Sequence, residues 1–176
     1  MGLSIIMGNM FSGKTSELIR QLKRLKVIGK NIIVVNSAKD TRSPEEVLKT
    51  HDNVQFNCHK VFDLFELMNR DEFDRADIIA IDEAQFFPRL KKFVECCLSI
   101  DKSVILAGLD ADSFQEKFGE LIDCIPLACD VTKLSALCMR CNDGTLGPFT
   151  KRIVDDKTLE LIGGSDMYIA TCRNHL

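Results

Sequence analysis

A motif near the start of the chain has the composition of a phosphate-binding loop. Its residues fit the pattern G-x-x-x-x-G-K-[ST] at every fixed position: Gly8, Asn9, Met10, Phe11, Ser12, Gly13, Lys14 and Thr15. In such a loop the glycines let the backbone wrap around a phosphate, and the start of the following helix attracts anions. Lys14 is expected to reach the outer phosphates, and the Thr15 hydroxyl is expected to face a magnesium ion. The motif predicts a binding site for a nucleoside triphosphate.

A pair of acidic residues ends an apolar run further along the chain. The segment "IIAIDEAQF" predicts a strand that delivers Asp82 and Glu83 at its carboxyl end, which is where ligands bind in open parallel sheets. Asp82 is expected to hold magnesium, directly or through water. Glu83 is a second carboxylate placed to accept a proton, from water in an NTPase or from a substrate hydroxyl in a kinase. The alternative, two acids that cap a helix, is disfavoured by the phosphate loop.

Two pairs of potential metal ligands lie in the C-terminal part of the chain. Cys138 and Cys141 form a C-x-x-C pair, and Cys172 and His175 form a C-x-x-H pair. Together they offer four sulfur or nitrogen ligands to a tetrahedral zinc ion. No βαβ unit begins at Cys138, which argues against a thioredoxin-like site. The alternative is two unrelated thiols near a frayed chain end. Bound zinc would tie down the terminal strand and close residues 142–171 into a loop suited to cover a substrate.

The first part of the chain alternates between strand and helix patterns. Apolar or β-branched runs predict buried strands at 3–7, 31–36, 54–58, 77–82 and 103–110. Apolar residues at helical spacing predict helices over 16–29, 61–70 and 89–100. This alternation implies an α/β fold, with a parallel sheet that carries helices on both faces. The polar stretch 37–53 has no clear period and is expected to be a mobile loop.

The pattern changes after about residue 130, where short β-prone segments are separated by Gly, Asn and Asp. These segments predict a small antiparallel appendage with almost no helix. We therefore expect two parts. Residues 1–130 form a P-loop NTPase domain with a RecA-like parallel sheet, and residues 131–176 form a β-rich zinc-binding subdomain whose lasso loop covers the substrate.

Composition excludes several classes of protein. The chain has 176 residues, of which 45% are hydrophobic and 28% charged, as in an ordinary globular protein with a core. The formal net charge of −3 argues against nonspecific nucleic-acid binding, which needs a basic surface. No apolar run approaches the length of about 18 residues that a membrane span needs. The N-terminus lacks the basic region of a signal peptide, so the expected location is cytoplasmic, where cysteines stay reduced.

The motifs together resemble those of type II thymidine kinases, the zinc-containing group of cytosolic, poxvirus and bacterial enzymes. The segments that carry the resemblance occur in the family's order: "GNMFSGKT", "AKDTR", "THD", "IDEAQF", "GLDAD", "KLSALCMRC", "FTKRI", "IGGSDMY" and the closing C-x-x-H. The resemblance covers the chain from Ser4 to His175. The phosphate loop alone would indicate only an NTPase, whereas the whole set is specific.

The resemblance implies a reaction, cofactors and partners. The enzyme would transfer the γ-phosphoryl group of ATP to the 5′-hydroxyl of thymidine, and of deoxyuridine, to give dTMP in pyrimidine salvage. The cofactors would be Mg²⁺ with the ATP and a structural Zn²⁺. The resemblance further implies feedback inhibition by dTTP and a homotetramer, with no nucleic-acid or membrane partner.

It also implies roles for single residues. Glu83 would be the general base, Thr15 and Asp82 would hold magnesium, and Asp40 and Arg42 would join the phosphate loop on the ATP side. The lasso loop would hold the thymine base mainly through main-chain groups. The residues implied around the nucleoside are Met10, Leu109, Phe114, Phe118, Leu159, Glu160, Leu161, Ile162, Gly163 and Tyr168.

The sequence departs from the family pattern at three places that bear on the site. Asn9 stands where the family commonly has a proline, and we expect it to loosen the phosphate loop slightly without removing a contact. In "GLDADSFQEKF" either Ser113 or Phe114 holds the position of the usual aromatic residue. His175 replaces the more common fourth cysteine, and an imidazole is an acceptable zinc ligand.

Two other functions are weighed against the kinase. An ATPase switch with a zinc ribbon as a nucleic-acid-binding arm is disfavoured by the acidic balance and by few basic and aromatic stretches. An adenylate-kinase-like enzyme normally needs an arginine-rich lid to bind its second nucleotide. The C-terminal part offers only Arg140, Arg152 and Arg173.

Overall fold

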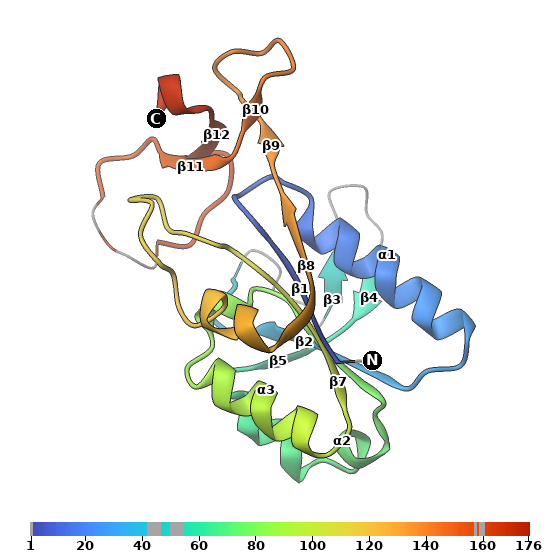
Figure 1. Cartoon of the computed structure of the whole chain (residues 1–176). Helices are drawn as coiled ribbons and strands as arrows, with labels where there is room; N and C mark the ends of the chain where they lie inside the picture. Colours follow the sequence, from blue (N-terminus) through green and yellow to red (C-terminus); the bar gives the residue numbers. More distant parts are fainter. Residues whose placement is uncertain (1, 42–46, 50–54, 157, 159–160) are drawn as a thin grey trace.

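The structure is a computed structural model of the chain that describes residues 2–41, 47–49, 55–156, 158 and 161–176. Its centre is a sheet of six parallel strands (Figure 1). In spatial order these are β5 (His59–Val61), β2 (Ile32–Ser37), β6 (Ile78–Ile81), β7 (Ser103–Gly108), β1 (Leu3–Gly8) and β8 (Ala128–Leu134). The inner strands are continuous apolar runs because helices cover both of their faces. The α/β prediction is confirmed.

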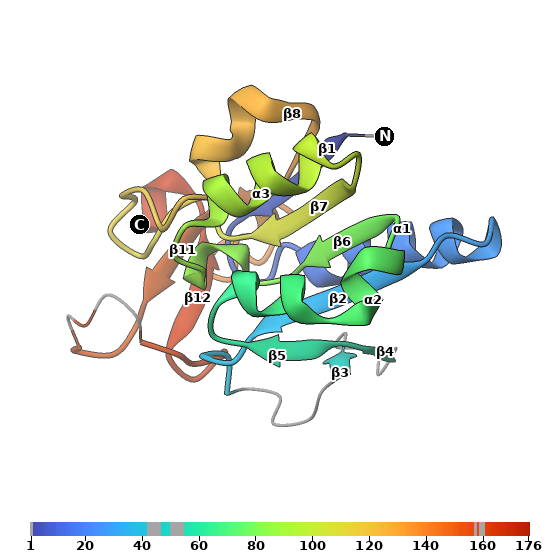
Figure 2. The same cartoon turned by 90° about the horizontal axis from the view of Figure 1, so that it is seen from below.

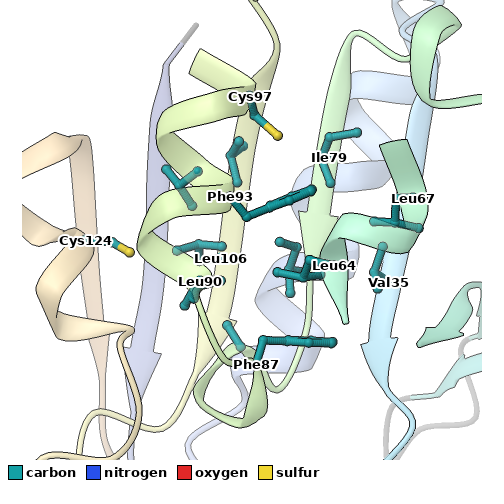
Figure 3. Packing of buried hydrophobic residues seen from close by; sticks show 14 of the residues in the cluster. Val35, Leu64, Leu67, Ile79, Phe87, Leu90, Phe93, Cys97, Leu106 and Cys124 are labelled. Atoms are coloured by element: carbon teal, nitrogen blue, oxygen red, sulfur yellow. The ribbon is translucent and has the colours of Figure 1, made fainter. Parts of the chain in front are cut away.

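Helices cover the sheet on both sides and bury two separate cores. On one face α1 (Lys14–Val27) packs Leu18, Ile19 and Leu22 against the strands. The other face is covered by α2 (Asp71–Arg75) and α3 (Leu90–Ser99), as Figure 2 shows. Figure 3 shows Phe93 and Leu90 of α3 packed beside Leu106 of β7. These two layers fix the carboxyl ends of the strands, where the site lies.

Two predicted elements differ from the structure. The helix expected over 61–70 is a shorter 3₁₀ helix, η1 (Leu64–Asn69), because β5 extends to Val61 and Asp63 caps the helix start through a capping box with Glu66. The stretch 37–53, expected to be a loop, contains β3 (Val47–Lys49), which pairs with β4 (Gln55–Asn57). The prediction that this stretch is mobile falls mostly on 42–46 and 50–54, outside the described residues.

The C-terminal part consists of two small antiparallel pairs, as the sequence predicted. The hairpin joins β9 (Ala136–Leu137) to β10 (Leu146–Gly147), and β11 (Phe149–Arg152) pairs with β12 (Tyr168–Thr171). A single 3₁₀ turn, η4 (Arg173–His175), follows β12. Figure 1 shows β9 and β10 extending beyond the central sheet beside this turn. β8 stays in the parallel sheet as far as Leu134, past the boundary expected between 130 and 131.

The remaining short helices are η2 (Ala84–Phe86), directly after β6, and η3 (Ile122–Leu127), directly before β8. No helix among the described residues has the length and apolar character that a membrane span requires.

Candidate functional site

The phosphate loop connects β1 to α1, as the sequence predicted. Gly8 lies so close to β8 that a Cβ atom there would be 2.2 Å from the Leu134 carbonyl oxygen. Gly13 has a φ of 83°, a left-handed conformation that favours glycine, and immediately precedes the first residue of α1. The Lys14 side chain is buried, and its Nζ donates to the Asn9 carbonyl oxygen over 2.7 Å. These contacts give the loop its defined shape.

Asn9 corrects one of our expectations. We expected it to loosen the loop, but its side chain is buried and is hydrogen bonded to the C-terminal part of the chain. A polar side chain that finds partners in a buried position adds constraints to the backbone that carries it. The residue therefore ties the loop down instead of loosening it.

The two acids after β6 lie beside the phosphate loop. The Thr15 hydroxyl donates to Asp82 Oδ2 over 2.9 Å. Burial, together with the nearby Glu83 carboxylate, raises the pKa of Asp82 above its usual range, and the Thr15 hydroxyl bond opposes this shift. Glu83 has a φ of 50°, which is unusual for a residue with a side chain and is typical of functional sites. A cation beside these groups would stabilise their charged forms.

Gln85 holds Glu83, and sequence reasoning missed it. Its Oε1 accepts the Leu109 backbone N–H over 3.0 Å, and its Nε2 donates to Glu83 Oε2 over 2.6 Å. The side chain is buried, so both amide atoms need partners. Because Leu109 is a donor, the amide oxygen must face it and the amide nitrogen must face Glu83. The only signal in the sequence was a polar residue in an otherwise apolar segment two positions after Glu83.

A single cavity of about 840 Å³ joins these groups to the C-terminal part of the chain. Among the residues predicted for the site, the following line it: Met10, Phe11, Gly13, Lys14, Thr15, Asp40, Asp82, Glu83, Leu109, Phe118, Leu161, Ile162, Gly163 and Tyr168. Asn36 at the end of β2 also lines it, and its Nδ2 donates to Asp40 Oδ2 over 3.3 Å. Asn36 is the last residue but one of β2, and Asp82 directly follows β6, so the strand-end rule applied to Asp82 would also have found Asn36.

Some predicted site residues lie elsewhere. Gly8, Asn9 and Ser12 belong to the phosphate loop but do not line the cavity. Ser113 lines the cavity, whereas Phe114 has 51% of its surface exposed and lies 5.7 Å from the Arg152 guanidinium carbon, measured to the ring centroid. The buried aromatic residue of this segment is Phe118, which packs edge-on against Phe86. The predicted residues Arg42, Leu159 and Glu160 lie outside the described residues.

Tyr168 and Arg152 hold the lasso loop against the cavity. The Tyr168 hydroxyl donates to the Leu161 carbonyl oxygen over 2.7 Å and accepts from Arg152 Nη2 over 3.1 Å. Arg152 Nη1 also donates to the Asp156 carbonyl oxygen over 2.5 Å. Side chains from the β11–β12 pair therefore hold Asp156 and Leu161, which lie within the segment that joins these two strands.

Cys138, Cys141, Cys172 and His175 form a cluster, as the sequence predicted, with all ligand atoms within 4.8 Å of one another. A tetrahedral zinc site with bonds of about 2.0–2.3 Å separates its ligand atoms by about 3.4–3.8 Å. Cys141 Sγ and Cys172 Sγ are 3.7 Å apart, and His175 Nδ1 is 3.4 Å from each of them. Cys138 Sγ is 3.7 Å from the same nitrogen. The cluster therefore fits zinc.

Backbone donors favour the thiolate form of Cys138. Cys138 Sγ accepts the N–H groups of Cys141 and Cys172, over 3.5 and 3.2 Å. Burial opposes ionisation of Cys138, but these bonds outweigh it and lower the pKa of its thiol. A thiolate is the form that binds a metal.

Comparison with known proteins agrees with the geometry. A family model described as thymidine kinase matches residues 1–176. Thymidine kinase a of Arabidopsis thaliana is 43% identical over 177 residues, covering 97% of this chain and 73% of the relative. The thymidine kinase of sheeppox virus (strain KS-1) is 39% identical over 171 residues, covering 97% and 94%. The cytosolic thymidine kinase of Bos taurus is 37% identical over 171 residues, covering 97% and 70%.

Proposed function

The chain belongs to the thymidine kinase family of phosphotransferases, and we propose that it transfers the γ-phosphoryl group of ATP to the 5′-hydroxyl of thymidine. The observation that carries this proposal is the cavity, because phosphate-loop residues, Glu83 and the lasso loop border the same space. The product would be dTMP, made in pyrimidine salvage. Family membership argues against the ATPase switch and the adenylate-kinase-like enzyme.

The phosphate loop and Asp82 form the proposed donor side. Thr15 Oγ1 and Asp82 Oδ2 are 2.9 Å apart, close to the separation of about 2.9 Å between neighbouring ligands of an octahedral Mg²⁺ ion. Bound magnesium would neutralise charge on the phosphates of ATP. Lys14 would leave the Asn9 carbonyl for a phosphate oxygen, and Asp40, with Arg42, would complete this side.

Glu83 is the proposed general base. It lines the cavity between the phosphate loop and Leu109, and Gln85 directs a donor at one of its carboxylate oxygens. The Glu83 carboxylate would accept the proton of the 5′-hydroxyl as the hydroxyl oxygen attacks the γ-phosphorus, and ADP would leave as the bond between the γ-phosphorus and its bridging oxygen breaks. Transfer reactions of this kind depend mainly on positioning and on neutralisation of charge. A rigidly held base fits that requirement.

The C-terminal part forms the proposed nucleoside side. Main-chain groups of Leu161, Ile162 and Gly163 would bind the polar edge of the thymine ring, because backbone donors and acceptors need no rotamer to be fixed. Met10, Leu109 and Phe118 would pack against the ring and its methyl group. Deoxyuridine lacks only that methyl, so it would be accepted, with transition-state binding weaker than that of thymidine by about 1–3 kcal/mol.

Transfer of phosphate from γ-labelled ATP to a panel of nucleosides, with magnesium, tests the proposal. We expect label on thymidine and on deoxyuridine, and none on deoxyadenosine, because the proposed base site would exclude purines by size. Label on deoxyadenosine alone, or on no nucleoside while ATP still binds, would show that the acceptor has been assigned wrongly.

Gln85→Met is expected to lower kcat by about 10- to 100-fold and to change the KM for thymidine and ATP little, because only the orientation of Glu83 is lost. Gln85→Glu keeps the acceptor for the Leu109 N–H but places a second carboxylate beside Glu83, so we expect kcat at least as low. Steady-state kinetics check both variants, with Gln21→Met on α1 as the control. A kcat within about twofold of wild type in both would contradict the positioning role.

Tyr168→Phe is expected to raise the KM for thymidine by about five- to tenfold. The hydrogen bond from the Tyr168 hydroxyl to Leu161 stabilises the ordered lasso loop by about 1 kcal/mol. The dissociation constant for ATP should not change. Kinetics at saturating ATP measure the effect. A changed ATP affinity with an unchanged thymidine KM would mean that the loop belongs to the donor side.

The remaining proposals concern the state of the protein. The cluster at the base of the lasso loop would hold a structural zinc ion. We further propose a homotetramer, inhibition by dTTP and a cytoplasmic location; the relative from Bos taurus is named a cytosolic enzyme.

A further inference from the structure

The Asn9 side chain points into the C-terminal part of the chain. Its Nδ2 donates to the Gly147 carbonyl oxygen over 2.9 Å, with a second, longer contact of 3.5 Å to the Phe149 carbonyl oxygen. Its Oδ1 accepts the Ala136 backbone N–H over 3.2 Å. Only 2% of the residue is exposed. A residue of the phosphate loop is thus bound to segments more than a hundred positions away in the sequence.

These contacts fix the orientation of the amide. The oxygen faces a donor, Ala136 N–H, and the nitrogen faces carbonyl oxygens. In a flipped amide the oxygen would face these carbonyl oxygens and the NH₂ group would face the Ala136 N–H, in a buried site. Ala136 and Gly147 face each other across the β9–β10 pair. The Asn9 amide therefore contacts both strands of the hairpin at once, and any change in their separation or register would break one of its bonds.

The backbone of the same residue belongs to the phosphate site. The Asn9 carbonyl oxygen accepts from Lys14 Nζ over 2.7 Å and from the Ser12 hydroxyl over 2.8 Å. The next residue is tied as well, since the Met10 N–H donates to Thr150 Oγ1 over 3.0 Å. The side chain of Asn9 and the backbone of Met10 thus bind the loop to the C-terminal part of the chain, while Lys14 bonds to a carbonyl group of the loop itself.

The hairpin continues directly into the metal cluster. Cys138 follows β9, and its N–H donates to the Thr145 carbonyl oxygen over 2.7 Å just before β10. Gly147 lies so close to this residue that an added Cβ would be 2.8 Å from Cys138 Cα. The position of Cys138 therefore sets the position of Gly147, which is the main partner of Asn9.

We propose that Asn9 is a positioning residue that couples the metal cluster to the phosphate loop. A metal held by Cys138 fixes the β9–β10 hairpin, the hairpin fixes the Asn9 amide, and the amide holds the loop in the shape that binds the phosphates of ATP. The inference deepens the proposed function, on which it rests for the identity of the nucleotide. It concerns nucleotide and metal binding only and needs no acceptor nucleoside.

Coupling between two binding sites is reciprocal, which provides the test. Zinc retention is measured by competition with a chromogenic chelator, for the zinc-loaded full chain, with and without a saturating non-hydrolysable ATP analogue and magnesium. For the wild type we expect the analogue to tighten zinc retention by about five- to tenfold. For Asn9→Ala, and for Asn9→Asp, which sets an oxygen against the Gly147 carbonyl, we expect a change of no more than about twofold.

Asn57→Ala is the matched control, because this exposed asparagine lies on β4 and takes no part in the cavity. It should retain the full effect of the analogue. Equal tightening in Asn9→Ala and wild type would overturn the proposal, and so would the absence of any effect in the wild type, a result that does not depend on whether a variant folds. Failure of thymidine phosphorylation would overturn the proposed function and leave this measurement intact.

Discussion

Glu83→Gln is expected to bind ATP with wild-type affinity and to lose about 10²- to 10⁴-fold in kcat, the range that removal of a general base produces. The amide has the size of the carboxylate but cannot accept the proton of the substrate hydroxyl. The substitution also changes the contact with Gln85, whose Nε2 donates to this carboxylate. An amide that turns its oxygen toward Gln85 keeps that bond, so the loss would report on proton transfer. Single-turnover transfer from labelled ATP, with a separate ATP titration, measures both quantities.

Glu95→Gln is the control for this experiment. Glu95 is an exposed acid on α3, outside the cavity, so the same change of charge there should leave kcat within about twofold. Two results would count against the assignment of Glu83. Transfer at the wild-type rate would exclude it as the base, and loss of ATP binding together with transfer would place it on the donor side instead.

Cys172→Ser is expected to release zinc, to lower the melting temperature by roughly 10 °C and to raise the KM for thymidine about tenfold. Cys172 is one of the four residues of the cluster and directly follows β12. Without this ligand the metal no longer joins the end of β12 to Cys138, so the strand that carries Tyr168 loses its anchor. Tyr168 in turn holds Leu161 at the cavity. Elemental analysis, thermal unfolding and nucleoside kinetics measure the three effects.

Cys129→Ser is the matched control, because Cys129 is an exposed free cysteine outside the cluster. It should keep its zinc, its melting temperature and its kinetics. Full metal content in Cys172→Ser would mean that the cluster is not the zinc site. Loss of metal with unchanged thymidine KM would mean that the lasso loop binds the nucleoside without help from the cluster.

The strands and the chemical groups could be read from the sequence because their signals are local. A run such as Ile78–Ile81 between charged residues predicts a buried strand wherever it occurs in an α/β fold. The phosphate loop is likewise defined by eight consecutive residues, from Gly8 to Thr15. The helix expected over 61–70 was placed wrongly because its apolar spacing is also compatible with a strand end followed by a capped 3₁₀ helix. The capping box of Asp63 and Glu66 was the signal that we overlooked.

Pairings between distant residues could not be predicted. Gln85 was missed because its role depends on the Leu109 N–H, which reaches it only when β6 and β7 lie side by side. Asn9 was misjudged because its partners, Ala136 and Gly147, lie in another part of the chain. The positions of Ser113 and Phe114 also depended on the path of the backbone after β7, which puts Ser113 at the cavity and leaves Phe114 half exposed beside Arg152.

The sequence by itself predicted which chemical groups this protein carries: a phosphate-loop motif, an Asp-Glu pair at the end of a strand and four potential zinc ligands. Residue type and short spacing suffice for that prediction, because the phosphate-loop motif, the acidic pair and each half of the zinc-ligand set span only a few consecutive residues. Only the tertiary structure decided how these groups act together. It places Gln85 in hydrogen-bond contact with Glu83, and it bonds the Asn9 side chain to the β9–β10 hairpin that leads to Cys138. Such couplings depend on the directions of single donors and acceptors across a packed interface, and those directions are fixed only when the chain has folded.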